Sequence, residues 1–264
     1  MDIIQVITRE LNVEKWQVEA AVKLIDEGCT IPFISRYRKE ATGTLNDEQL
    51  RNLNERLAYL RNLEDKKAQV LGSIEEQGKL TEELAAAIDS AKTLAEVEDL
   101  YRPYKQKRRT RATIAKEKGL APLAALLFAQ ERDCPQPEVA AQDFLDPEKG
   151  VETVEDALQG ASDIIAEQIS DDADIRKSLR ALIARQGQLV SRAATEDDSV
   201  YRLYYDFTQA VSRLQGHQVL AINRGEKEGI LKVSVVLERE QALPLLRRAG
   251  MTSTPVPALR SPGS

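Results

Sequence analysis

The densest concentration of chemically active side chains in this sequence is a run of cations between positions 102 and 111. The chain carries a formal net charge of -6, so this run reverses the sign of the charge locally. Such a reversal concentrates positive potential that attracts a polyanion. Tyr101 and Tyr104 lie in the same stretch, and aromatic rings beside guanidinium groups suit stacking on bases. The run therefore indicates contacts with the phosphates of RNA or DNA. Its members, which we call the basic block, are Arg102, Lys105, Lys107, Arg108, Arg109 and Arg111.

A structural role explains the basic block equally well. Its cations are too closely spaced to share one helical face, and Pro103 reinforces the expectation of a loop or a helix junction. In an acidic chain, a basic loop also pairs with carboxylates elsewhere, and phosphate contacts leave no sequence signature of their own. Phosphate binding and internal ion pairing therefore both stay open at this point.

The sequence offers no arrangement that is typical of a catalytic or metal site. His217 is the only histidine, and its place near the expected start of a helix favours a structural role. The glycines between 216 and 229 lack the spacing of a phosphate-binding loop. Cys29 and Cys134 form no metal knuckle or disulfide framework, and they fit a reducing compartment. We therefore expect no catalysis, no cofactor, no metal and no small-molecule substrate.

Composition favours helices and an aqueous location. Charged residues make up 30% of the chain and aromatic residues only 5%, while the abundant residue types lose little side-chain freedom in a helix. The longest apolar stretch, around Ala121 to Ala129, is too short to span a bilayer, and the start of the chain does not read as a signal peptide. We expect a cytoplasmic protein that does not enter a membrane.

Three short helices are expected in the first 40 residues. Apolar residues from Ile3 to Leu11 have the spacing of one helical face, and a second amphipathic segment ends near Gly28. Thr30 can cap a third helix that carries Pro32 in its first turn. This pattern resembles a helix-turn-helix, the element with which many proteins read DNA, and it equally fits a generic helical cap.

A long helix is expected from about 47 to 76. Asn46 and the residues after it form a capping-box-like start, and leucines then recur at intervals of 3, 4 and 3 from Leu50 to Leu60. Glu64 and Lys67 interrupt this apolar register before it recovers at Leu71. We therefore expect a helix that packs along one side inside a helical protein, and no coiled coil.

The second half of the chain is expected to be helical until close to its end. Helices are predicted at 121–129 and from Thr153 to about Ile169, and the acids at 171–174 most simply begin a further helix, a metal site being the minor alternative. One strand is predicted at 230–237. It needs a partner, either from 188–194 or from chain that is absent here.

These patterns predict a mainly α, multi-helix scaffold with a helix-turn-helix-like element, a long helix and a short β element near the C-terminus. We expect an N-terminal helical region at 1–76, a helical core with a terminal strand at 77–240, and a disordered or unrelated tail at 241–264.

Several longer motifs resemble the N-terminal part of the bacterial Tex family of transcription accessory proteins. The motifs extend over about residues 3 to 237, in order, so a chance match is very improbable. They are Ala21 to Gly28 continuing into Thr30 to Glu40, Gly78 to Thr81, Glu98 to Arg111, Gly160 to Glu167, and His217 to Gly229.

The resemblance implies a helical scaffold with an early helix-turn-helix-like element, in a protein that associates with RNA or DNA. In complete family members, an RNase H-like domain, helix-hairpin-helix elements and an S1 domain follow, and the S1 domain is regarded as the main nucleic-acid grip. None of those later domains is expected within these 264 residues. The expected function is therefore a non-catalytic, nucleic-acid-associated scaffold. The alternative is a protein-docking module for RNA polymerase or ribosome components that does not touch nucleic acid.

Overall fold

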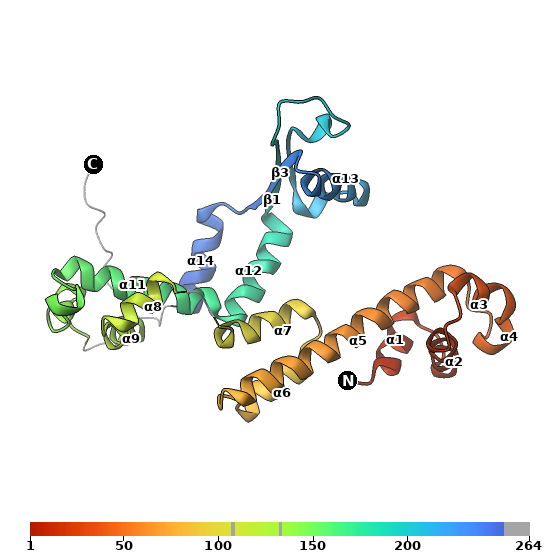
Figure 1. Cartoon of the computed structure of the whole chain (residues 1–264), viewed down its shortest axis with the longest axis horizontal. Coiled ribbons are helices and arrows are strands. Elements are labelled where there is room, and N and C mark those ends of the chain that lie inside the picture. Colours follow the sequence, from red (N-terminus) through yellow and green to blue (C-terminus); the bar gives the residue numbers. More distant parts are fainter. Residues whose placement is uncertain (107–108, 132–133, 251–264) are drawn as a thin grey trace. The chain divides into compact units, whose positions relative to one another are not determined.

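The computed structural model describes residues 1–106, 109–131 and 134–250 of the 264-residue chain. Its contacts define two compact units, unit 1 (Met1–Tyr104) and unit 2 (from Lys105 onward). The mainly α class is confirmed, since fourteen α-helices and one small sheet account for most of the described residues (Figure 1). None of the helices in these ranges combines the length and the apolar run that a membrane crossing requires.

Unit 1 is helical throughout its regular structure. The long helix α5 begins and ends where the sequence predicts, and Figure 1 shows the shorter helices distributed along its length. The elements are α1 (Ile3–Leu11), α2 (Lys15–Asp26), α3 (Ile31–Tyr37), α4 (Lys39–Thr42), α5 (Asp47–Glu76), α6 (Glu82–Ser90), α7 (Leu94–Tyr101) and the 3₁₀ turn η1 (Arg102–Tyr104).

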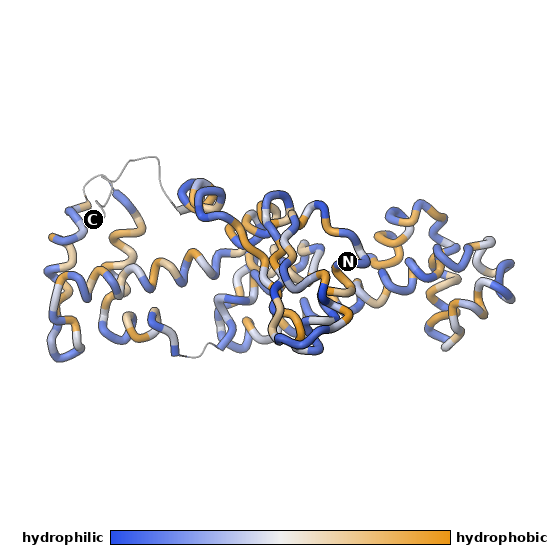
Figure 2. The backbone as a smooth tube through the Cα atoms, turned by 90° about the horizontal axis from the view of Figure 1, so that it is seen from above, coloured by the Kyte–Doolittle hydropathy of each residue, from blue (hydrophilic) through white to orange (hydrophobic). Residues whose placement is uncertain are grey.

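The core of unit 1 is built on one face of α5. Asn46 and Gln49 form the expected capping box at its start, with side-chain to backbone distances of 2.8 and 3.0 Å. Burying each leucine of the stripe stabilises the fold by about 1.5–3 kcal/mol relative to an exposed position. Hydrophobic and polar residues alternate along the helices in Figure 2, as one-sided packing requires. The buried residues of α5 are Leu50, Leu53, Leu57, Leu60, Leu63, Lys67, Val70 and Ile74.

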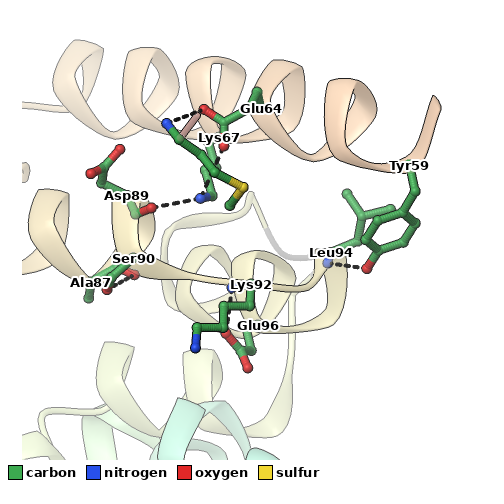
Figure 3. A network of polar contacts seen from close by, with 10 residues as sticks. Tyr59, Glu64, Lys67, Ala87, Asp89, Ser90, Lys92, Leu94 and Glu96 are labelled. Atoms are coloured by element: carbon green, nitrogen blue, oxygen red, sulfur yellow. Dashed lines mark hydrogen bonds and ion pairs between the residues drawn. The ribbon is translucent and has the colours of Figure 1, made fainter. Parts of the chain in front are cut away.

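Helices α1, α2 and α3 pack on α5, and so do α6 and α7. The hydroxyl oxygen of Tyr59 on α5 accepts the backbone N–H of Leu94 at 3.0 Å, so it caps the first turn of α7 (Figure 3). Ile88 of α6 and Val97 of α7 are buried in the same core as the leucines of α5. The domain boundary that the sequence suggested after residue 76 therefore falls inside unit 1, which extends to Tyr104.

Unit 2 combines a helical core with a small sheet. A second cluster of buried residues lies between α8, α9, α10 and α11, and the helices predicted at 121–129 and from 153 are both present. The elements are α8 (Arg111–Glu117), α9 (Ala121–Ala129), α10 (Pro137–Gln142), η2 (Pro147–Lys149), α11 (Val154–Asp171), α12 (Ala173–Gln186), β1 (Gln188–Ala193), η3 (Arg202–Tyr204), β2 (Asp206–Ala210), η4 (Val211–Arg213), α13 (Gly216–Lys227), β3 (Leu231–Val236) and α14 (Arg239–Gly250).

The predicted strand and its predicted partner pair with one another. Strands β1 and β3 are antiparallel, with Gln188 opposite Val236 and Ala193 opposite Leu231. A third strand, β2, pairs with the other edge of β1 and was not expected, because its sequence lacks a clear alternation of apolar and polar residues. Helix α13 packs on β3, where Gly225 leaves room for the side chain of Leu231.

Part of the expected tail is ordered. Residues 241–250 belong to α14, which packs against α12. Pro244 lies inside this helix, where it removes one backbone N–H donor. Thr252 to Ser264, which carry the remaining prolines, lie outside the described residues.

Candidate nucleic-acid interface

The basic block crosses the junction between the two units. Arg102 belongs to η1 at the end of unit 1, whereas Lys105, Arg109 and Arg111 belong to unit 2. Lys107 and Arg108 lie outside the described residues. The junction expected from Pro103 is present, because α7 ends at Tyr101 and α8 begins only at Arg111. The structure therefore confirms the irregular segment but places the described cations of the block in different units.

The two tyrosines beside the basic block pack against unit 1. Tyr101 and Tyr104 are both half-buried against the core around α5. The hydroxyl of Tyr101 lies 2.9 Å from that of Ser73, and the side chain of Gln77 donates to the backbone carbonyl of Tyr104 at 3.0 Å. Since these rings help to close the hydrophobic core, only part of their surface is accessible to a base.

Thr110 fixes the end of the basic block in unit 2. Its hydroxyl oxygen accepts the backbone N–H of Thr113 at 3.1 Å, which caps the first turn of α8. The same hydroxyl lies 3.0 Å from the carboxylate of Glu167 on α11, to which it donates. The backbone at Arg111, the first residue of α8, is therefore fixed by the contacts of Thr110 with α8 and with α11.

Close packing between α8 and α11 depends on Gly160. A Cβ atom at this position of α11 would lie 2.3 Å from Cδ1 of Leu120 and 3.2 Å from Cβ of Ala115. The first distance is shorter than real Cβ contacts and the second is tighter than most of them, so only glycine fits without a shift of its neighbours. Gly160 thus brings the acidic residues of α11 within reach of the cations on α8.

The cations around the start of α8 are paired with carboxylates of their own unit. Arg109 contacts Glu117 at 2.7 Å, Arg111 contacts Asp163 at 3.6 Å, and Lys116 contacts Glu167 at 3.2 Å. The Arg109–Glu117 pair is exposed at both ends, and such pairs contribute about 0–1 kcal/mol, whereas Asp163 and Glu167 are half-buried. Arg109 and Arg111 nevertheless keep 67% and 84% of their side-chain surface exposed, so a phosphate can reach both guanidinium groups.

The sequence itself carries a signal for these acidic partners. Asp156, Asp163 and Glu167 are separated by seven and four residues, which places them on one face of α11. That face is the one that meets α8, and Asp156 and Asp163 line a shallow cavity of about 200 Å³ together with Arg111 and Lys118. Because acids and cations share its lining, the cavity has no preference for an anion.

The residues considered for catalysis or metal binding do not converge. His217 is exposed in the first turn of α13. Cys29 and Cys134 are half-buried free thiols, one in each unit. Over the ranges with described coordinates, no group of three or more His, Cys, Asp or Glu side chains is arranged to hold a metal ion.

Comparison with protein families gives two matches along the chain. Residues 1–75 match the model of the Tex-like protein N-terminal domain, and residues 133–253 match the model of the Tex central region. The second match includes the whole of α14 and so extends beyond the point at which the sequence suggested an unrelated tail.

Curated relatives resemble nearly the whole chain. It is 45% identical over 240 residues to the transcriptional accessory protein Tex of Neisseria gonorrhoeae, covering 89% of this chain and 31% of that protein. It is 44% identical over 241 residues to the protein tex of Bordetella pertussis, covering 90% of this chain and 30% of the relative. Human S1 RNA-binding domain-containing protein 1 is 31% identical over 245 residues, which cover 89% of this chain and 24% of that protein. The chain thus spans about a third or less of the length of these relatives.

Proposed function

The chain belongs to the Tex family, and from this premise we propose that it forms the helical scaffold of a transcription accessory protein that associates with RNA or DNA. The observation that carries the proposal is the match of both the N-terminal and the central region with family models. The names of two relatives, a transcriptional accessory protein and an S1 RNA-binding domain protein, support the association with nucleic acid. The proposal includes a cytoplasmic location and the absence of catalysis.

The described cations of the basic block are suited to phosphate contact in spite of their partners. The pair of Arg109 with Glu117 is exposed and contributes little free energy, so exchange of its carboxylate for a phosphate costs little, and the guanidinium of Arg111 is itself exposed. A phosphate also offers several strong acceptor oxygens to the fork of an arginine. Contacts of this type depend on charge and carry no information on base sequence.

The internal pairs also favour a second candidate function. Arg109 and Arg111 each have a carboxylate partner within unit 2, which lowers the net positive charge that the basic block presents. If these pairs are purely structural, the helical surfaces serve to dock proteins such as RNA polymerase or ribosome components. A pull-down from nuclease-treated bacterial lysate tests this alternative, because protein partners survive the nuclease and partners bridged by nucleic acid do not.

Fluorescence anisotropy with the full chain tests the proposal. Labelled single-stranded RNA, single-stranded DNA and duplex DNA are titrated over a salt series, and binding that weakens steeply with salt is expected. Reversing the charges with Arg108→Glu and Arg109→Glu should weaken binding to all sequences and flatten the salt dependence by about 0.7–0.9 per lost phosphate contact. The matched control is Lys23→Glu with Lys79→Glu, two exposed lysines of unit 1. Equal affinity and equal salt slopes for the two double variants would remove the basic block from the role.

A further inference from the structure

We propose that the exposed face of α3, together with the start of α4, binds single-stranded nucleic acid. Bases stack on Phe33 and Tyr37, and phosphates contact Arg36 and Lys39. The surface lies in unit 1, and it is distinct from the basic block that the proposed function invokes.

The face is defined by the helical period of α3. Phe33 and Tyr37 are four residues apart, so they stand on one side of the helix, and their ring centroids lie 5.4 Å from one another at an angle of 48°. Their exposed fractions are 43% and 62%, which is high for aromatic side chains. Arg36 is exposed on the same side, whereas Ile34, on the neighbouring flank of the helix, is fully buried. The aromatic pair therefore belongs to the solvent face of α3 and takes no part in the core.

The backbone that carries the aromatic pair is held firmly. Ile34 packs in the core of unit 1, and α3 contacts the long helix α5. Thr30 caps the helix by accepting the backbone N–H of Phe33 at 3.4 Å, and Pro32 restricts the first turn. A ligand that stacks on this pair therefore pays little to order the protein surface beneath it.

The cations beside the aromatic pair are available. Within the described residues, Arg36 and Lys39 form no ion pair, and both are exposed. Arg38 contacts Glu40 at 3.1 Å, and this glutamate is the only acid between residues 31 and 43. Arg109 and Arg111 differ in this respect, because carboxylates of their own unit already occupy them. The α3 face is therefore a positively charged patch on a chain of net charge -6.

The side-chain chemistry selects a single strand over a duplex. An aromatic ring can stack only on a base whose face is free. In a duplex, neighbouring bases cover these faces, whereas a single strand can expose them. Reading base edges in a major groove instead uses polar side chains such as Asn, Gln or Arg, and among the exposed positions of α3 only Arg36 is of this type. Stacking tolerates every base, so little sequence preference is expected.

The test uses the full chain and labelled 12-nucleotide probes: oligo-U RNA, oligo-dT DNA and a duplex of equal length. The double variant Phe33→Ala/Tyr37→Ala should weaken binding of the single strands about tenfold or more and leave the salt slope unchanged. The double variant Arg36→Gln/Lys39→Gln should flatten the slope by about 1.4, since single strands lose about 0.7 per phosphate contact. A probe that contains 2-aminopurine should change its fluorescence on binding, and this change should vanish in the Ala variant.

Two controls separate stacking from unfolding and from general loss of apolar surface. The double variant Phe33→Tyr/Tyr37→Phe retains both rings and should bind like the unmodified chain. Leu220→Ala removes a side chain that is 73% exposed in unit 2, and it should have no effect. All variants should keep the thermal unfolding midpoint of the unmodified chain, because the altered side chains are exposed.

The outcomes also separate this proposal from the proposed function. Equal affinity of the Phe33→Ala/Tyr37→Ala variant and the unmodified chain overturns the α3 site and points to a protein partner for this face. If Arg108→Glu with Arg109→Glu abolishes binding and Phe33→Ala/Tyr37→Ala does not, the proposed function stands without the α3 site. If the unmodified chain binds none of the probes at low salt, both proposals fail together.

Discussion

The ammonium group of Lys67 donates to the backbone carbonyl of Asp89 at 2.7 Å, from a side chain that is almost fully buried (Figure 3). Asp89 lies in the last turn of α6, where backbone carbonyl groups lack helical partners and the partial negative charge of the helix dipole attracts cations. Glu64, one turn earlier on α5, lies 3.3 Å from the same ammonium. Lys67 thus occupies an apolar position in the α5 stripe because it caps the C-terminus of α6.

Replacing this lysine with an apolar residue of similar length should loosen the contact between α5 and α6. In Lys67→Met, hydrophobic packing is kept, but the carbonyl of Asp89 loses a charged donor, and such hydrogen bonds contribute about 1.5–3 kcal/mol. We expect a loss of this size in the free energy of unfolding, measured by urea denaturation. The control is Lys66→Met, whose lysine forms a partly exposed pair with Glu98 and should contribute about 0–1 kcal/mol. Equal stability of Lys67→Met and the unmodified chain would show that desolvation of the ammonium offsets the bond.

Two helical glycines should respond to the same substitution with opposite signs. Gly160→Ala gains about 0.8–1 kcal/mol of helix propensity but overpacks the contact with Leu120, which costs about 1–3 kcal/mol. Gly72→Ala on α5 meets no atom within 4 Å and should show the gain alone. Urea denaturation measures the free energy of unfolding of each variant relative to the unmodified chain. A stabilised Gly160→Ala variant would contradict the tight packing of α8 on α11.

The sequence predicts the helices of this fold well because their signals are local. The capping box at Asn46 and the leucine spacing after it fix α5 without reference to the rest of the chain. The strand at 231–236 was found from its β-branched residues, and its partner from the need for pairing. Strand β2 was missed because its place in the sheet depends on pairing with β1 rather than on its own pattern.

The candidate site was harder to predict, since the sequence reveals charge but not its partners. The cations of the basic block are evident, whereas the pairing of Arg111 with Asp163 joins residues that are 52 positions apart in the chain. The exposure of Phe33 and Tyr37 is equally invisible, because helical spacing alone does not say which side of a short helix faces the core. Both features depend on tertiary packing.

The pair between Asp26 and Arg61 should make the stability of unit 1 depend on acid pH. Two hydrogen bonds of 2.7 and 2.8 Å from Arg61 lower the pKa of the Asp26 carboxyl below its usual value of about 3.9. Because the pKa of Asp26 is lower in the folded state, the pair contributes fully to the free energy of unfolding above the unfolded-state pKa of about 3.9. This contribution is lost as the pH falls through the folded-state pKa.

Asp26→Asn should therefore lower the urea midpoint at pH 7 and pH 5, and the gap to the unmodified chain should close towards pH 3. High salt should narrow the gap at pH 7, because both side chains are about half exposed. Glu19→Gln, which removes the exposed i,i+4 pair with Lys15, serves as control and should change the midpoint little. A gap that stays constant from pH 7 to pH 3 would contradict a role for the charged pair.

Removing the carboxylate that competes for Arg111 should strengthen nucleic-acid binding if the basic block contacts phosphates. In Asp163→Asn, the exposed guanidinium of Arg111 loses a half-buried partner at 3.6 Å, and the interaction contributes at most about 1 kcal/mol. The affinity for single-stranded RNA should therefore rise, by up to about fivefold, and anisotropy at fixed salt measures it. Glu155→Gln removes the same charge from an exposed position of α11 without an ion pair among the described residues, so it reports the effect of net charge alone. An equal rise in both variants would assign the gain to net charge, and no rise in either would indicate that Arg111 serves the packing of α8 on α11 and does not contact phosphate.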